Sequence, residues 1–254
     1  MPPIQHCIEP DWPAPASVLA LSTTRSGGHS RPPYESFNLA HHVGDDPVAV
    51  NANRALLADG LPPGSAVQWL NQVHGARVIP AGRDGALPEA DASFTAESGI
   101  ACAVMTADCL PVLFCTRAGD RVAAAHAGWR GLVGGVLEAT VAAMGAAPAE
   151  IMAWLGPAIG PGAFEVGPEV REAFLAAAGG DRPAADRCFL PSATRPGHYL
   201  ADLYGLARVR LHLAGIGDIY GGDSCTFGDV ERFYSYRRDG RTGRMGSLVM
   251  LRPG

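Results

Sequence analysis

The chain has 254 residues, of which 47% are hydrophobic and 18% charged, and its formal net charge is −5. This balance is typical of a folded globular protein, and the lack of any basic block argues against a nucleic-acid partner. All 20 basic residues are arginine, which excludes enzymes that form a Schiff base on lysine and phosphate-binding loops that require one.

The N-terminal segment MPPIQHCIEPDWPAP has neither the basic region nor the apolar region of a signal peptide, and no apolar run is long enough to span a membrane. The six cysteines are scattered along the chain without a CxxC pair. We therefore expect a reduced, cytoplasmic protein with no disulfides and no membrane partner.

Apolar periodicity and turn residues predict the secondary structure. In chain order we expect a strand at 18–22, a helix at 49–58, a strand at 67–70, three successive strands at 100–106, 111–116 and 121–127, a helix after Gly131 that extends to Met144, a strand at 151–155, helices at 168–178 and 202–213, and a last strand at 246–251. Strands joined by tight turns, with the helices set apart, indicate an α+β fold. No repeat or charged linker interrupts the chain, so we expect one domain over residues 1–254.

Three polar segments place a metal-binding side chain at the end of a predicted strand. They contain His74 in NQVHG, Cys109 in ADCLP and His126 in HAGWRG. Zinc accepts imidazole nitrogen and thiolate sulfur, and three protein ligands leave a fourth position open for water or substrate. The spacing is not that of a zinc finger, so by itself it leaves open that these are ordinary core residues.

The same side chains also suit a second chemistry. Cys109 and His126 can form a nucleophilic dyad, with His74 or Asp108 as the group that orients the histidine. A thiolate bound to zinc is a poor nucleophile, so the two interpretations exclude each other.

Substrate contacts are predicted in three places. The turn Gly128-Trp129-Arg130-Gly131 leads into a helix, whose free N–H groups and Arg130 would form an anion site beside His126. Arg25, in a polar turn after a strand, is a second candidate for phosphate or sugar contact. Aromatic residues lie beside arginines in 233–240, as in a lid or a stacking surface for a base. The alternatives are that the arginines form ordinary ion pairs and that 233–240 is a surface hairpin.

Taken together, these motifs resemble the YfiH/laccase-domain family, also called DUF152, peptidoglycan editing factor or multicopper polyphenol oxidase. The matching segments run nearly from end to end: TRSGG at 24–28, FNL at 37–39, HVGDD at 42–46, NR at 53–54, NQVHG at 71–75, ADC at 107–109, HAGWRG at 126–131, GPAIGP at 156–161, FEVG at 164–167 and the stretch 233–245. The resemblance implies packed mixed β-sheets with flanking helices, similar to the catalytic domain of a bacterial cytotoxic cysteine hydrolase. It also implies zinc on His74, Cys109 and His126.

The resemblance implies several activities. Family members are described as copper-dependent polyphenol oxidases, as enzymes of purine nucleosides, and as factors that police a peptidoglycan precursor. A multicopper site needs clustered histidines, whereas this chain has eight histidines and no HxH pattern. One zinc ion suits attack of an activated water at C6 of adenine.

We therefore predict a zinc enzyme that phosphorolyses inosine, guanosine, adenosine or methylthioadenosine and deaminates adenosine, with nucleoside and phosphate as partners, as a monomer or weak oligomer. Asp108 is a candidate general acid or base or a support for the ligands, Arg25 and Arg130 are candidates for phosphate or ribose, and Asn71 and Gln72 for hydrogen bonds to substrate. The alternatives are a copper-dependent, laccase-like oxidase, a cysteine hydrolase or amidase, and a binding protein that guards cell-wall synthesis.

Overall fold

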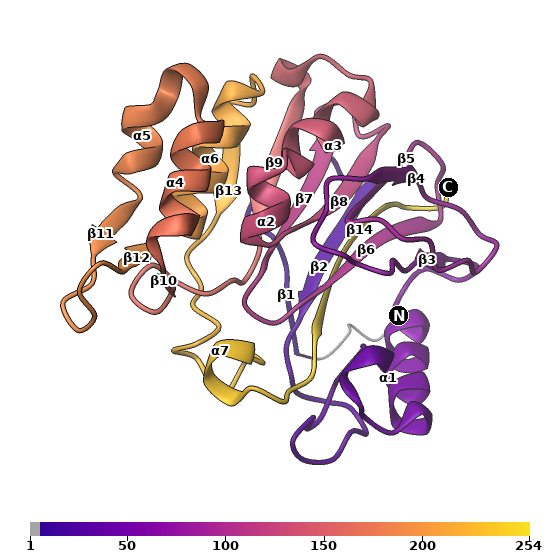
Figure 1. Ribbon diagram of the computed structural model, residues 1–254. Helices are drawn as coiled ribbons and strands as arrows, with labels where there is room; N and C mark the ends of the chain where they lie inside the picture. Colours follow the sequence, from indigo (N-terminus) through magenta and orange to yellow (C-terminus); the bar gives the residue numbers. More distant parts are fainter. Residues whose placement is uncertain (1–5) are drawn as a thin grey trace.

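Two β-sheets packed face to face form the centre of the structure, a computed structural model that describes residues 6–254 (Figure 1). The first five residues of the segment inspected for a signal peptide lie outside the described part. The five-stranded sheet has the order β1 (Cys7–Ile8), β2 (Val18–Thr23), β14 (Met245–Leu251), β6 (Ile100–Thr106) and β3 (Ala66–Gln68). The six-stranded sheet has the order β13 (Asp218–Gly221), β9 (Ile151–Leu155), β7 (Leu110–Thr116), β8 (Val122–Ala127), β5 (Ala92–Thr95) and β4 (Val78–Pro80).

Both sheets are mixed. Antiparallel pairs join the central strands, and parallel pairs join β3 to β6, β13 to β9 and β4 to β5. The prediction of packed mixed sheets in an α+β fold is thereby confirmed.

The central strands are buried on both faces, so alternate side chains enter different cores. On β6, Cys102 and Val104 pack between the sheets, whereas Ala101 and Met105 point to the outer layer. On β7, Leu113 packs between the sheets while its neighbours point to the helices. This is why these strands appear in the sequence as continuous apolar runs rather than as an alternation of polar and apolar residues.

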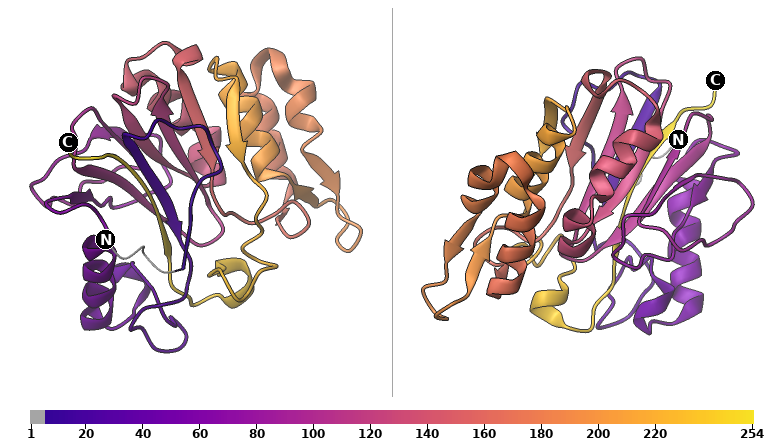
Figure 2. Two further views of the ribbon diagram at one scale, coloured as in Figure 1. Left: turned by 180° about the vertical axis from the view of Figure 1, so that it is seen from behind. Right: turned by 45° about the horizontal axis from the view of Figure 1, so that its top comes forward.

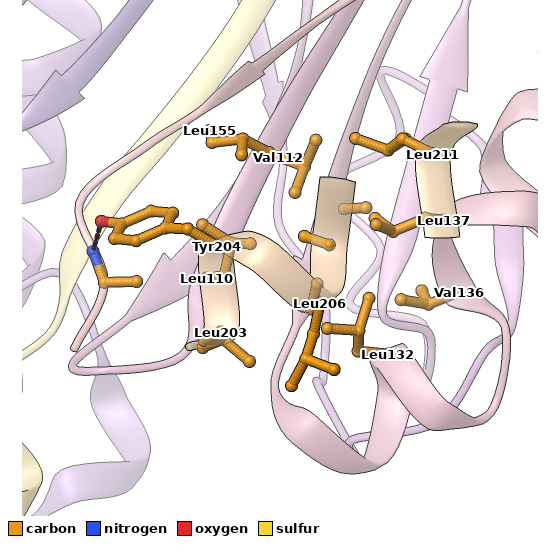
Figure 3. Packing of buried hydrophobic residues seen from close by; sticks show 14 of the residues in the cluster. Leu110, Val112, Leu132, Val136, Leu137, Leu155, Leu203, Tyr204, Leu206 and Leu211 are labelled. Atoms are coloured by element: carbon orange, nitrogen blue, oxygen red, sulfur yellow. Dashed lines mark hydrogen bonds between the residues drawn. The ribbon is translucent and has the colours of Figure 1, made fainter. Parts of the chain in front are cut away.

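Helices cover the outer face of the six-stranded sheet (Figure 2). They are α2 (Trp129–Val133), α3 (Val136–Met144), α4 (Pro168–Ala177), α5 (Arg182–Asp186) and α6 (Leu203–Leu213), beside a small sheet of β10 (Glu165–Val166), β12 (Tyr199–Ala201) and β11 (Phe189–Pro191). Figure 3 shows Leu110 and Val112 of β7 in the same cluster as Leu132, Leu137 and Leu206 from three of these helices. Each fully buried leucine stabilises the fold by about 1.5–3 kcal/mol.

The opposite face, on the five-stranded sheet, is covered by α1 (Pro47–Asp59), whose Leu57 packs with Leu21 and Leu248. The side chain of Asp46 caps the helix by accepting a 2.9 Å hydrogen bond from the backbone N of Val48. The structure also has a short helix, α7 (Tyr236–Asp239), and one-turn 3-10 helices at His41–Val43, Pro148–Glu150 and Gly179–Asp181. No helix of the described residues is long and apolar enough to cross a membrane.

The structure corrects two expectations. The single helix expected from Gly131 to Met144 is two helices, because Gly135 takes a left-handed backbone conformation (φ 88°) that ends α2 and starts α3. The successive strands 100–106 and 111–116 are not neighbours in one sheet. β6 pairs with β14 and β3, whereas β7 pairs with β8 and β9, so the chain crosses from one sheet to the other at residues 107–109.

Candidate metal centre

The crossing between the sheets brings together the three side chains that the sequence singled out. One ligand atom from each of His74, Cys109 and His126 lies within 4.8 Å of the others. The distance from Cys109 Sγ to His74 Nε2 is 3.9 Å, and the two imidazole rings meet edge to face with their centroids 4.8 Å apart. Over residues 6–254 this is the one group of three or more His, Cys, Asp or Glu side chains placed to hold a metal ion.

Local backbone geometry explains how each ligand reaches the site. His74 lies in the loop after β3 and Cys109 in the crossing segment. Both segments turn sharply, since His74 has φ 62° and Asp108 has φ 87°. His126 is on β8, two residues after Ala124 and therefore on the same face of the strand, and Ala124 packs between the sheets. Its side chain therefore points into the same layer, at the end of the sandwich where Cys109 enters.

A buried carboxylate holds two of the ligands in place. Asp91 is fully buried, and its Oδ1 accepts hydrogen bonds from the backbone N of His74 (2.9 Å) and from His126 Nδ1 (2.8 Å). Its Oδ2 accepts from the backbone N of Val73 (3.2 Å) and Gly75 (2.7 Å). Because a carboxylate only accepts, His126 keeps a proton on Nδ1, so Nε2 is the nitrogen whose lone pair binds a metal when the imidazole is neutral.

Asp91 was not identified from the sequence. Burial raises its pKa, but hydrogen bonds from His126 and Gly75 outweigh that effect and hold the pKa below its usual value. The available signal was an acidic residue in ADASF, at the start of an otherwise small and apolar strand, where an unpaired carboxylate would be costly.

The thiol and imidazole of the site stabilise each other's charged forms. Burial raises the pKa of Cys109, but the charge on His126 and hydrogen bonds from both histidines lower it to about 6. Burial lowers the pKa of His126, but the Cys109 thiolate and Asp91 raise it to about 9. The pair therefore favours the thiolate of Cys109, the form that binds a metal or attacks an electrophile.

Gly128 leaves room for the ligands. A Cβ atom at this position would lie 2.9 Å from Cys109 Sγ and 3.0 Å from His74 Cδ2. Gly128, the first glycine of HAGWRG, is thus required for close packing against the cluster, and it also turns the chain into α2.

The donor set fits a divalent ion of the zinc or copper class. Zn–S and Zn–N lengths of about 2.3 and 2.0–2.1 Å place tetrahedral donors about 3.6 Å apart, close to the 3.9 Å between Cys109 and His74. Three protein side chains leave the fourth coordination position of the metal open to water or substrate. A trigonal set of two histidines and one cysteine is also a copper set.

An open cavity of about 320 Å³ lies against the cluster. It is lined by His42, Gln72, His74, Met105, Thr106, Ala107, Cys109, His126, Tyr236 and Arg244. Tyr236 belongs to the stretch 233–240 that the sequence suggested as a lid, and Arg244 follows that stretch. Gln72 is also there, but its amide is bound to both backbone groups of Met105, at 2.8 and 2.9 Å. It therefore shapes the wall of the cavity.

Asp108 lies next to the cluster in sequence, but its carboxylate has other partners and does not line the cavity. It accepts hydrogen bonds from the hydroxyl of Thr226 and the backbone N of Arg237, both at 2.6 Å. These bonds tie the crossing segment to the C-terminal loops. The position of Asp108 therefore does not suit an acid or base that acts in the cavity. It suits a residue that supports the segment carrying Cys109.

The structure does not bring Arg25, Arg130 or Asn71 to this cavity either. Arg25 donates to the carbonyls of Glu35 and Val230 and lines a different cavity. Arg130 is exposed and stacks on the ring of Trp129 at 4.5 Å. Asn71 is exposed, with its backbone engaged in a bridge. Each arginine follows a strand as expected, but the side chain of Arg25 is bound by backbone carbonyls elsewhere and that of Arg130 lies on Trp129.

The chain is similar to known proteins over nearly its whole length. It is 57% identical over 244 residues to a Pseudomonas aeruginosa protein named purine nucleoside phosphorylase, covering 96% of this chain and 98% of that one. It is 54% identical over 246 residues to Escherichia coli purine nucleoside phosphorylase YfiH, with the same coverage.

Solved structures show the same similarity in the fold. The crystal structure of a Neisseria meningitidis protein of family DUF152 superposes with a TM-score of 0.90 at 52% identity, covering 98% of this chain and 100% of that one. YlmD from Geobacillus stearothermophilus also gives 0.90, at 33% identity, covering 98% and 97%. Residues 19–252 match the family model described as multi-copper polyphenol oxidoreductase laccase. The chain therefore belongs to this laccase-domain family, as its sequence motifs indicated.

Proposed function

We propose that this protein is a zinc-dependent purine nucleoside phosphorylase in which His74, Cys109 and His126 hold the metal. The observation that carries the proposal is the convergence of these three donors on an open cavity of about 320 Å³. Such a volume is in the range of small-molecule sites. The names of the relatives from Pseudomonas aeruginosa and Escherichia coli support the same activity.

In phosphorolysis, an oxygen of hydrogenphosphate forms a bond to ribose C1′ while the bond from C1′ to the purine nitrogen breaks. The electron pair of that bond leaves with the purine, which takes up the proton that phosphate gives up. The products are ribose 1-phosphate and the free base. When bound, a zinc ion supplies positive charge that stabilises the anionic oxygens at the reacting centre.

The chain's own residues prepare the site for this reaction. Asp91 keeps the proton of His126 on Nδ1, so that Nε2 faces the cluster. Gly128 leaves space beside Cys109 and His74. Tyr236 is exposed at the cavity, and its ring offers an apolar surface on which a purine can stack.

We propose inosine, guanosine, adenosine and methylthioadenosine as substrates, and deamination of adenosine as a second reaction at the same centre. In deamination, water adds to C6 of adenine and ammonia leaves. One metal ion with an open position would suit both reactions. Among the residues that the structure describes, a single group of metal donors is found, which argues against a multicopper oxidase; copper on the same three donors is the alternative to zinc.

A second candidate, a cysteine hydrolase, is favoured by one observation. Cys109, His126 and Asp91 form a connected row of thiol, imidazole and carboxylate, the arrangement of a nucleophilic triad. The orienting group in this row is Asp91, whereas the sequence suggested His74 or Asp108.

The test is incubation of the zinc-loaded protein with inosine and phosphate, followed by chromatography for hypoxanthine and elemental analysis for zinc and copper. Cys109→Ala should lose both metal and turnover, whereas Cys188→Ala, at a half-buried cysteine outside the cavity, should keep both. Unchanged turnover in Cys109→Ala would contradict the proposal. Purified protein that carries copper and oxidises phenols would favour the laccase alternative.

A further inference from the structure

The cavity at the metal centre adjoins a second cavity of about 350 Å³. The two share three lining residues, His42, Tyr236 and Arg244. The second cavity is completed by Val43, Gly240, Arg241 and Thr242. The boundary between the two cavities is therefore formed largely by the C-terminal stretch, opposite the metal ligands.

Arg244 is held rigidly at this boundary. Its backbone N donates to Asn38 Oδ1 at 2.9 Å, and its Nη1 donates to the carbonyls of Thr242 and Gly243, both at 3.0 Å. Within the part of the chain described, Nε and Nη2 have no protein acceptor, and no carboxylate lies within ion-pair distance of the guanidinium. Burial lowers the pKa of the half-buried Arg244, and the charges of Cys109 and Asp108 raise it without forming an ion pair with it. Its free donors at the cavity can therefore bind an anion directly.

Thr242 provides an independent observation. Its side chain is only 2% exposed, and it lines the second cavity. Its Oγ1 is buried and has no hydrogen-bond partner among residues 6–254. Buried hydroxyls nearly always have a partner, so Thr242 Oγ1 is free to bond a group that enters the second cavity.

We propose that inorganic phosphate binds between the two cavities on the free donors of Arg244, with Thr242 and His42 as further hydrogen-bonding groups. The proposal rests on the proposed function, because phosphate is the second substrate of phosphorolysis. A guanidinium fork matches two phosphate oxygens, and the position lets a third oxygen face a nucleoside in the cavity at the metal. Arg25 and Arg130, the arginines favoured by the sequence, are engaged or exposed elsewhere.

The first arm of the test is kinetic, on zinc-loaded protein with inosine and phosphate varied separately. Arg244→Gln should raise KM for phosphate about 10- to 100-fold, the range for losing a charge-assisted hydrogen bond, while KM for inosine changes much less. Thr242→Val, which keeps the shape of the side chain, should raise KM for phosphate by a smaller factor. Arg195→Gln, at an exposed arginine of the β11–β12 turn, is the matched control and should change neither.

The second arm measures phosphate binding alone, by calorimetry with inorganic phosphate and no nucleoside. Wild-type protein should bind phosphate, and Arg244→Gln should bind it at least about tenfold more weakly. If no nucleoside is cleaved but phosphate binding still depends on Arg244, the proposed function is wrong and the phosphate site stands. If inosine is phosphorolysed and neither Arg244→Gln nor Thr242→Val changes KM for phosphate, the site is wrong and the function stands.

A stronger effect of Arg130→Ala on KM for phosphate than of Arg244→Gln would also overturn the site. If Arg244→Gln does not fold, an unaltered KM for phosphate in Thr242→Val overturns it, and an increase supports it.

Discussion

Replacing Asp91 by asparagine tests whether one buried carboxylate organises the metal centre. Each of its oxygens accepts two hydrogen bonds: Oδ1 from His74 N and His126 Nδ1, Oδ2 from Val73 N and Gly75 N. Asparagine has the same shape but only one acceptor oxygen. Whichever way its amide is turned, the NH₂ group faces two donors, so two hydrogen bonds are lost.

The expected magnitude follows from this geometry. Hydrogen bonds to a charged group contribute about 1.5–3 kcal/mol each, so losing two should lower the free energy of unfolding of the zinc-free protein by about 3–6 kcal/mol. That is a large part of the about 5–15 kcal/mol that stabilises a typical domain. Because His126 and the loop of His74 lose their support, zinc affinity should also fall about 10- to 100-fold.

The assays are urea unfolding of the zinc-free protein and competition for zinc with a chromophoric chelator. Asp186→Asn is the matched control, because Asp186 is also paired, with Arg171, but is about half exposed. An exposed ion pair contributes only about 0–1 kcal/mol, so this variant should barely change stability and leave zinc affinity unaltered. If Asp91→Asn behaved like Asp186→Asn in both assays, the organising role of Asp91 would be refuted.

Three further outcomes are expected. Gly128→Ala should fold but lose zinc affinity, measured by the same competition, because the new Cβ would lie 2.9 Å from Cys109 Sγ; wild-type affinity would contradict the packing argument. Removing zinc with a chelator should expose Cys109 to iodoacetamide. Because its pKa is about 6, labelling at pH 7 should be much faster than at Cys188, whose pKa burial raises to about 11, and should slow as the pH falls through 6. If mass spectrometry shows equal labelling of Cys109 with and without chelator, Cys109 is excluded as a metal ligand. Tyr204→Phe should lower the free energy of unfolding by about 1–3 kcal/mol in urea, because its buried hydroxyl accepts from Ala158 N at 2.8 Å (Figure 3) and donates to the Ser224 carbonyl at 2.7 Å; no change would mean that these bonds contribute nothing.

Much of the secondary structure could be predicted because it depends on local patterns. The strands at 100–106 and 121–127 and the helices at 168–178 and 202–213 are found within a residue or two of their expected bounds. Periodicity alone did not indicate that Gly135 divides a helix, since the apolar face continues on both sides of it. Nor did it indicate that β6 and β7 belong to different sheets, because both are buried runs whose pairing partners are far away in sequence.

The candidate site divides in a similar way. His74, Cys109 and His126 could be named because imidazole and thiolate are the donors that soft and borderline metals require, and the motifs around them are specific to a family. The arginines could not be ranked, because all 20 have the same chemistry and nothing local separates Arg244 from Arg130.

By itself, then, the sequence determined the types of the elements, the candidate metal donors and the family, since these depend on side-chain chemistry and short-range order. Only the tertiary structure decided that Asp91 supports two of the donors, that Asp108 is tied to Thr226, and that Arg244 faces the metal cavity while Arg25 does not. The physical reason is that such contacts arise where segments distant in sequence are packed together by the two sheets. The residues next to it in the chain do not indicate which distant segment it will contact.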